Sequence, residues 1–593
     1  MSNVNKIALY HLPIFALFTT LEELLLRITV KTLVYFPYSA AMSDDGHKLE
    51  GDSTHPECEV NEIDSVDSEE DDEYPESDGE EDGEYPESDD EEGVGSNTFE
   101  ERPVYSPESL QRRISCFILT QNVTPHIVKN KDFRDMMTSQ FPSLTLDHET
   151  TMKHCLTLFE ESKTEVRRFL NSMGRLVCLS VDVLTRYSQI DVGPDFICLS
   201  ASFIDNEWKL RKWILRFKKY SNGDFDQFVV KALDDWNLND DKVYTLTSRK
   251  VDASGDYIQS TKSKLEGKNR LPYDSHIFSV RCCAEMFGLM AEDAFGEISD
   301  IIRMIEELNW SKSECMWHLT NSKLKNALEL EALGEFNSEL VTKNYSVPSA
   351  EQWEKVRIVY KLVELVHDVA KKIFEVKNST ANLFLYNFPQ LRTSLVLEAS
   401  SPDAFTLKLA KKMLKRFDKY IKKNYLVLAI ASVMDPRCKM QFIEDVSAKL
   451  EGIDGLPQAS AVLETVRSIY EHNEAVKVNE ETVKSDLDLY LEDPVLPREE
   501  KFNVLKWWES EGVLKYPNTS EVAREVLAIP MSVASSFNAY YYLENRPPPD
   551  VSITTSGSQV MNAVVCCRSW RPEKRLSAFE IKFLFHSAGV NIF

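Results

Sequence analysis

The chain has 593 residues, of which 43% are hydrophobic and 28% charged, a composition typical of a globular protein with a sizeable core. Its net charge of −28 is unevenly distributed, because residues 51–100 contain 23 Asp or Glu and no Lys or Arg. The rest carries 73 acidic and 68 basic side chains, so the overall acidity does not exclude a nucleic-acid binder. Eleven widely spaced cysteines without a Cys-x-x-Cys pair exclude a small disulfide scaffold.

Residues 1–42 are an apolar extension of doubtful role. The apolar run Ile7–Thr20 is interrupted by charged residues from Glu22 onward. A helix that spans a bilayer needs about 20 mainly apolar residues, so we expect no membrane partner. Two alternatives stay open for this segment: a weak signal peptide, or a true start of translation at Met42.

Residues 43–105 are acidic, rich in Ser, Gly and Pro, and have little to bury, which predicts a disordered region. The hexapeptide Glu-Tyr-Pro-Glu-Ser-Asp occurs at 73–78 and again at 84–89. A solvating spacer and a mimic of nucleic acid are both consistent with this composition.

From residue 108 the pattern becomes globular, and we assign 108–274 to N-terminal helices and a mixed α/β sheet. Helical periodicity covers Met152–Leu170. The predicted strands are Arg175–Val181, Phe196–Ile204, Trp208–Phe217 and, after a helix at Phe225–Asn237, Lys242–Thr247.

Residues 275–495 are predicted to be all helical, with long amphipathic runs at Gln352–Val376 and Thr406–Lys423. The apolar stretch Tyr425–Met434 should be deeply buried. A last region covers 500–575, and 576–593 is a tail.

Several short blocks, taken in order, carry a family resemblance. They are Thr124–Val128, Leu179–Thr185, Phe203–Asp205, Arg281–Cys282, Trp317, Leu428–Arg437, Trp507–Trp508, Tyr516–Pro517 and Ala523–Pro530. Through them the chain resembles the hAT superfamily of transposases, and within it the plant RICESLEEPER/DAYSLEEPER-like zinc finger BED proteins. The resemblance covers roughly 110–575 and implies an RNase H-like fold interrupted by a large all-α insertion, with a C-terminal dimerisation region.

The resemblance also implies three carboxylates that hold a pair of Mg²⁺ ions about 4 Å apart. Asp182 matches the first of these acids. Arg249 and Lys250 stand at the second position, and Asp252 could replace it only with a shifted loop. Ser536 stands at the third position. Because two of three ligands are replaced, we expect a degenerate transposase that is not an enzyme and has lost its Mg²⁺ site.

The residues before 110 do not supply the Cys and His ligands of a BED-type zinc finger, so we expect neither metal nor cofactor. Side chains that could contact a nucleic acid are Lys209, Arg211, Lys212, Arg216, Arg249, Lys250 and Trp317. A solvated strand face is the alternative for the first four. Candidates for dimerisation are Trp507, Trp508, Leu527, Ile529 and Pro530, with the chain's own core as their alternative.

These observations predict a catalytically inactive hAT transposase-like protein that forms a homodimer and binds double-stranded DNA or chromatin as a nuclear regulator. Nuclear proteins are further expected partners. The alternatives are a protein–protein interaction module without DNA binding, an active nuclease, and an inactive transposon remnant.

Overall fold

The computed structural model describes residues 106–120, 123, 125–184, 196–220, 225–238, 242–249, 257–266, 277–309, 317–336, 346–374, 379–473, 484–498, 502–533 and 558–570. The predictions for segments 1–42, 43–105 and 576–593, and for Lys250, Asp252 and Ser536, concern residues outside these ranges. All described residues belong to one compact unit, Thr98–Phe593.

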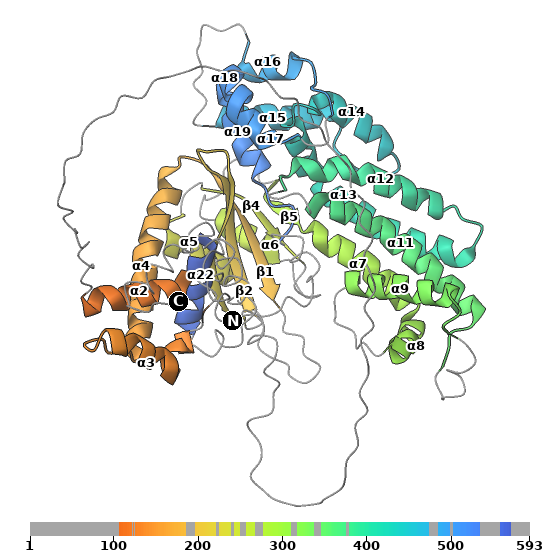
Figure 1. Cartoon of the computed structure of the whole chain (residues 1–593). Coiled ribbons are helices and arrows are strands. Elements are labelled where there is room, and N and C mark those ends of the chain that lie inside the picture. The colour runs from red at the N-terminus through yellow and green to blue at the C-terminus, as the bar shows by residue number, and fades with distance from the viewer. Residues whose placement is uncertain are drawn as a thin grey trace, which may run out of the picture. The chain divides into compact units, whose positions relative to one another are not determined.

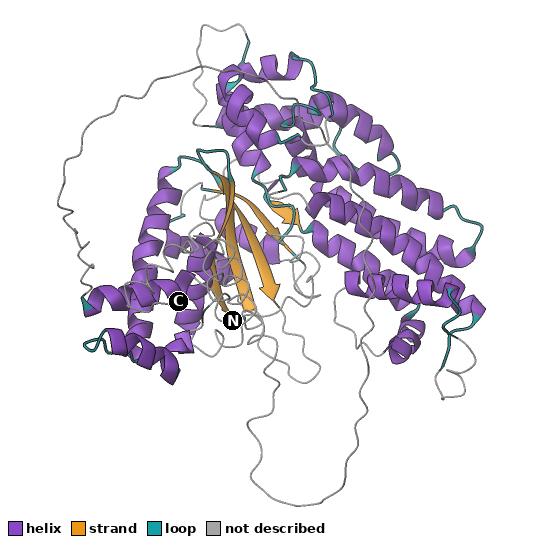
Figure 2. Cartoon of the chain, in the orientation of Figure 1, coloured by secondary structure: helices purple, strands orange, loops and turns teal. Residues whose placement is uncertain are grey.

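A five-stranded mixed sheet lies at the centre of this unit, with the strand order β3-β2-β1-β4-β5 (Figure 2). The strands are β1 (Val177–Leu184), β2 (Phe196–Ile204), β3 (Leu210–Lys219), β4 (Val243–Ser248) and β5 (Ser279–Arg281). The first three pair antiparallel, whereas β4 and β5 run parallel to β1. The four strands predicted from the sequence are confirmed to within four residues. The three-residue β5 was missed because so short a segment has no periodicity.

Helices from both ends of the chain cover one face and one edge of the sheet (Figure 1). They are α2 (Pro107–Thr120), a 3-10 turn (Pro125–Lys129), α3 (Lys131–Gln140), α4 (His148–Ser172), α5 (Phe225–Trp236), α6 (Tyr257–Glu266) and α22 (Ser558–Trp570). Asp147 caps the N-terminus of α4 by accepting a hydrogen bond from the Thr150 amide. Trp570 of α22 stacks on Phe159 of α4, with ring centroids 5.6 Å apart.

The helix α22 also protects the edge strand β3. The amides of Ile214 and Phe217 donate to Ser569 Oγ and Asn562 Oδ1, each at 2.8 Å. Trp570 Nε1 donates in turn to the Ile214 carbonyl at 2.8 Å. Exposed edge strands present unpaired backbone groups that invite aggregation, so these side chains close an edge of the sheet with a segment more than 300 residues downstream.

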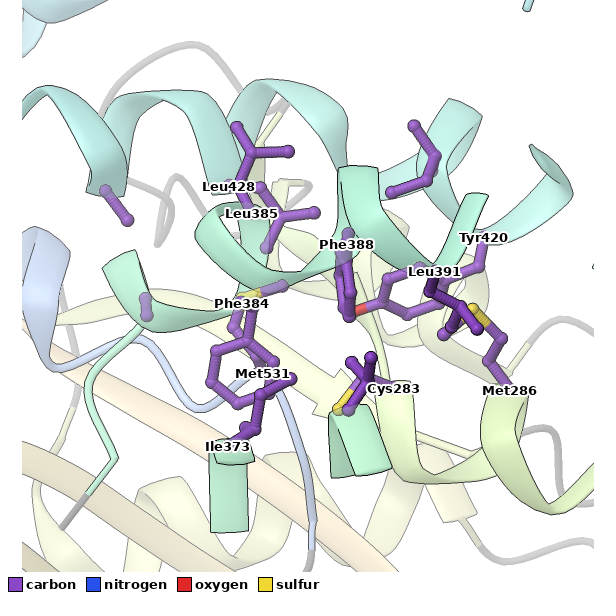
Figure 3. Close-up of a cluster of buried hydrophobic side chains, with 14 of the residues drawn as sticks. Cys283, Met286, Ile373, Phe384, Leu385, Phe388, Leu391, Tyr420, Leu428 and Met531 are labelled. Carbon is purple, nitrogen blue, oxygen red and sulfur yellow. The ribbon is translucent and has the colours of Figure 1, made fainter. Parts of the chain in front are cut away.

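An all-helical body adjoins the other end of the sheet (Figure 1). Its helices are α7 (Cys283–Gly296), α8 (Ser299–Asn309), α9 (Trp317–Ala332), α11 (Ala350–Phe374), α12 (Asn382–Glu398), α13 (Ala404–Val433), α14 (Lys439–Lys449), α15 (Ala459–His472), α16 (Asp486–Glu492), α17 (Val504–Trp507), a π turn η3 (Trp508–Gly512), α18 (Val513–Lys515) and α19 (Pro517–Leu527). Figure 3 shows its core, where Phe384 and Phe388 of α12 meet Tyr420 of α13 and Cys283 of α7. None of the described helices is long and apolar enough to cross a membrane.

The helical body continues beyond residue 495, where the sequence analysis ended the insertion. Helix α19 contacts α13, α15 and α16, and Trp508 of the π turn is fully buried. After α19 the chain runs along β4 and β5, where Cys283 N donates to Met531 O at 2.9 Å and Thr247 Oγ1 donates to Pro530 O at 2.6 Å. The predicted 500–575 region is therefore divided between the helical body and α22 on the sheet.

A charged cluster joins α19 to the turn between β2 and β3. Arg524 is buried, its guanidinium lies 3.9 Å from the ring centroid of Trp208, and it donates to the Asp205 carbonyl. Glu521, one turn earlier, pairs with Arg175 at 2.5 Å. Burial lowers the pKa of Arg524 to about 10, and the nearby carboxylates of Glu521 and Asp205 oppose that shift. These contacts hold the helical body against the sheet.

Candidate functional site

Asp182 lies near the end of β1 on the sheet face that turns away from α4. Asp182 is paired with Cys198 in the register of β1 and β2, and its side chain is only 7% exposed. Alternation along the strand places Ser180 on the same face, opposite Ser200 of β2 and Thr247 of β4. All of these positions are buried. Asp182 lies at the end of this row of polar side chains, and the segment that follows α19 covers the row at Thr247, which donates to the Pro530 carbonyl.

Arg249 directly follows β4 and occupies the space beside Asp182. The parallel register pairs Val181 with Ser248, so the next residue of each strand extends to the same edge of the sheet. Arg249 Nη2 lies 3.1 Å from Asp182 Oδ1 and donates to the Val183 carbonyl at 2.6 Å. With the Arg249 side chain 17% exposed, this is a largely buried ion pair.

The third position of the expected triad, Ser536, lies three residues beyond the described segment that ends at Val533. The described part of this segment runs close to β4 and β5, where Cys282 Sγ lies 3.5 Å from Ser532 Oγ. Within the described residues, the His, Cys, Asp and Glu side chains close enough to share a metal ion do not include Asp182.

The basic side chains predicted on β3 each have a partner within the protein. Lys209 pairs with Glu207 at 2.8 Å, and Lys212 Nζ donates to the Val533 carbonyl at 2.7 Å. Two arginines of the same strand pair with carboxylates, Arg211 with Asp205 at 2.7 Å and Arg216 with Asp235 at 3.1 Å. The structure places Arg211, Lys212 and Arg216 on β3 and Lys209 just before it, but does not gather them into a patch of free positive charge.

The aromatic and apolar candidates are buried inside the protomer, and this burial corrects the roles predicted for them in nucleic-acid binding and dimerisation. Trp317 begins α9 and is 7% exposed, so it is not available to stack on a nucleic-acid base. The same correction applies to the side chains predicted for a dimer interface, which are buried in the protomer's own core: Trp507, Trp508, Leu527 and Ile529. Pro530 contributes its carbonyl to Thr247. These residues join the two parts of the protomer.

A row of exposed lysines on α13 was missed by the sequence analysis. The row, called here the α13 lysine row, consists of Lys411, Lys415, Lys419 and Lys422. Intervals of four, four and three residues put these side chains along one side of the helix over roughly 16 Å. Among the described residues none of the four forms an ion pair, and all four are exposed. The four-residue interval in Thr406–Lys423 was the available signal.

Neighbouring charges on α13 are neutralised, which isolates the row. Lys408 pairs with Glu297 at 2.8 Å, and Arg416 pairs with Asp293 at 2.8 Å. The carboxylate of Asp418 is held by Arg392 of α12 at 3.0 Å. The remaining surface of the helix therefore carries an excess of positive charge.

The order 3-2-1-4-5, an acid at the end of the first strand, and an all-helical body between β5 and the last helix define the class: an RNase H-like fold of the transposase type. Three family models match the chain. Residues 190–277 match the ZBED1 RNase-like domain, 382–473 match the hAT-like transposase, RNase-H fold, and 486–570 match the hAT family C-terminal dimerisation region. The chain is therefore similar to hAT transposases in its RNase H-like and C-terminal dimerisation regions.

Curated relatives extend this likeness over most of the chain. The zinc finger BED domain-containing protein RICESLEEPER 1 of Oryza sativa subsp. japonica is 27% identical over 79% of this chain and 75% of its own length. DAYSLEEPER of Arabidopsis thaliana, also described as a zinc finger BED domain-containing protein, is 24% identical over 80% and 75%. The putative AC transposase of Zea mays is 22% identical over 79% and 66%. The predicted resemblance is confirmed.

Proposed function

We propose that this protein is a non-catalytic, dimeric, transposase-derived protein of the nucleus that binds the backbone of double-stranded DNA. The observation that carries the proposal is the contact between Arg249 and Asp182, which puts a guanidinium beside the acid that matches the first metal ligand of the family. Three further features support it: the α13 lysine row, the match to a dimerisation region, and the likeness to zinc finger BED proteins.

The chemistry of the side chains around Asp182, here called the Asp182 pocket, argues against metal-dependent strand cleavage. Mg²⁺ takes hard oxygen ligands, whereas the guanidinium of Arg249 is permanently cationic and offers only donors. An ion placed at Asp182 would have to displace Arg249 from both Asp182 Oδ1 and the Val183 carbonyl. The side chains present here do not fit a two-metal site, so we propose that neither Mg²⁺ nor another catalytic cofactor is used.

The α13 lysine row supplies a surface suited to phosphates. Four residues of α-helix rise about 6 Å, so successive side chains can each reach a different phosphate of one duplex. DNA carries one negative charge per about 1.7 Å of its axis, and each neutralised phosphate releases counterions into solution. Three carboxylates on or next to α13, those of Asp293, Glu297 and Asp418, are already paired with other cations, so they do not compete with DNA for these ammonium groups.

The salt dependence of DNA binding tests this surface. Fluorescence anisotropy of a labelled mixed-sequence duplex would be measured with the full chain between 50 and 200 mM salt. Four phosphate contacts predict a log–log slope near −3.6, which corresponds to a roughly 100-fold loss of affinity over this range. Replacing the whole α13 lysine row by Gln should remove this contribution to the slope.

A charge-matched control replaces four exposed lysines that are scattered over the described surface, namely Lys129, Lys325, Lys506 and Lys515. This variant has the same net charge as the row variant, so an effect limited to the row assigns binding to α13. Equal effects of both variants would indicate attraction by net charge alone. If the wild-type chain did not bind duplex DNA at 50 mM salt, the protein–protein interaction module would become the better function.

Exposed apolar side chains in the matched dimerisation region are the better candidates for a subunit interface. Leu514 of α18 is 84% exposed and Leu489 of α16 is 45% exposed. A Leu514→Glu variant should shift the mass measured by light scattering from two chains toward one. Leu333→Glu, at a 76% exposed position outside the dimerisation region, is the matched control. A wild-type protein with the mass of one chain would contradict the dimer.

A further inference from the structure

A polar cluster lies between α9 and α11, outside the Asp182 pocket. Glu364, His367 and Asp368 of α11 stand at positions i, i+3 and i+4, which share one face of a helix. One possible ligand atom from each of them lies within 4.8 Å of the others. His367 Nδ1 is 3.8 Å from Glu364 Oε1. These side chains present one imidazole and two carboxylates to a common point.

The neighbouring helix α9 adds polar groups to the same seam. Asn321 Nδ2 donates to Glu364 Oε2 at 2.5 Å, which fixes this carboxylate from outside the cluster. His318 lies one turn before Asn321 on the same helix. The adjacent Trp317 packs its ring edge-to-face with His367, with centroids 6.0 Å apart.

We propose that Glu364, His367 and Asp368 bind one divalent transition metal ion of the zinc class. Zn²⁺ takes imidazole nitrogen and carboxylate oxygen at about 2.0–2.2 Å in tetrahedral sites. Donor atoms in such a site are roughly 3.5 Å apart, so side-chain rotations of about 1 Å close the cluster around the ion. Asn321 then acts as the outer hydrogen-bond partner that orients a ligating carboxylate.

This site is separate from the Asp182 pocket, and its role is structural. Its three ligands all lie on α11, and Asn321 of α9 donates a hydrogen bond to one of them, Glu364. An ion bound there would fix the Glu364 carboxylate and, through Asn321, help to hold the N-terminal half of α9 against the helical body. Binding to the folded chain alone raises stability by mass action, so the metal should also raise the melting temperature.

Cobalt spectroscopy and zinc titration test the proposal on the full chain after removal of metal by chelation. Co²⁺ should bind with one equivalent per chain and give visible absorption bands of tetrahedral coordination. Titrated Zn²⁺ should displace the cobalt and raise the melting temperature. His367→Gln and Asp368→Asn should each weaken binding at least 10-fold, while their metal-free melting temperatures stay close to that of the wild type.

The matched control is His472→Gln, an exposed histidine that follows Glu471 on α15. This variant should bind cobalt as the wild type does. The proposal is overturned if no cobalt spectrum develops, or if the spectrum persists unchanged in His367→Gln. A strong sulfur-to-cobalt band in the near ultraviolet would also overturn it, because the ion would then be held by cysteines elsewhere.

Discussion

The strand β3 and the helix α13 are both rich in Lys and Arg, yet the fold uses their charges in different ways. On β3, Arg211 and Arg216 are held by carboxylates of a turn and of a neighbouring helix. On α13, the α13 lysine row has no such partner among the described residues. The comparison teaches that a basic segment becomes a binding surface only where the fold leaves its charges unpaired.

Like the arginines of β3, Arg249 is paired with a carboxylate, that of Asp182. Among the variants considered, its removal should have the largest effect on stability. Arg249→Ala removes the cation that pairs with the buried Asp182 carboxylate, so we expect a loss of about 3–5 kcal/mol in the free energy of unfolding. Urea denaturation followed by circular dichroism measures this loss. The double variant Asp182→Leu with Arg249→Leu should recover much of it. A loss below about 1 kcal/mol would mean that the pair is solvated.

Arg211→Gln tests the paired charges of β3. The Asp205 carboxylate also accepts hydrogen bonds from the Glu207 and Lys209 amides, so the turn keeps part of its support. We expect a loss of about 1–2 kcal/mol in the free energy of unfolding. The salt slope of DNA binding should stay that of the wild type. A flatter slope would place β3 in the DNA-binding surface and weaken the contrast with α13.

Lys439 provides a lysine that is buried, in contrast to the exposed α13 lysine row. Its ammonium donates to the Tyr490 and Asp493 carbonyls, and burial lowers its pKa to about 8. The unfolded chain therefore binds more protons between pH 8 and 10, because a free lysine titrates near 10.4. Over that window the free energy of unfolding should rise with pH in the wild type relative to Lys439→Met. A difference between the two proteins that does not change with pH would contradict the lowered pKa.

Lys415→Gln should have the smallest effect on stability, below about 0.5 kcal/mol, because this side chain is exposed. Its effect should be confined to DNA, where the loss of one phosphate contact makes the salt slope less steep by about 0.9. Anisotropy titrations at four salt concentrations resolve this change. A slope identical to that of the wild type would remove Lys415 from the contact surface.

Local sequence signals predicted the strands, because β1 and β2 are nearly continuous apolar runs. The family resemblance put Arg249 at the position of the second acid, and the parallel register of β1 and β4 puts Arg249 next to Asp182. The fold also follows the predicted division into a sheet and a helical insertion, apart from its C-terminal limit.

Long-range contacts could not be predicted in the same way. The Lys212 ammonium is bound by the Val533 carbonyl, and the edge of β3 is closed by Asn562 and Ser569. Nothing in the local pattern of β3 indicates these partners. Likewise, Trp508 could serve an interface or a core by composition alone, and only the packing of the helical body shows that it is buried.

Strand cleavage measures the central claim most directly. Supercoiled plasmid DNA would be incubated with the full chain and Mg²⁺, and retardation and nicking would be read on native and denaturing gels. We expect the plasmid to be retarded by the wild type, less so by the variant of the α13 lysine row, and to stay unbroken in every sample. Mg²⁺-dependent nicks that disappear in Asp182→Asn would contradict the proposed loss of catalysis.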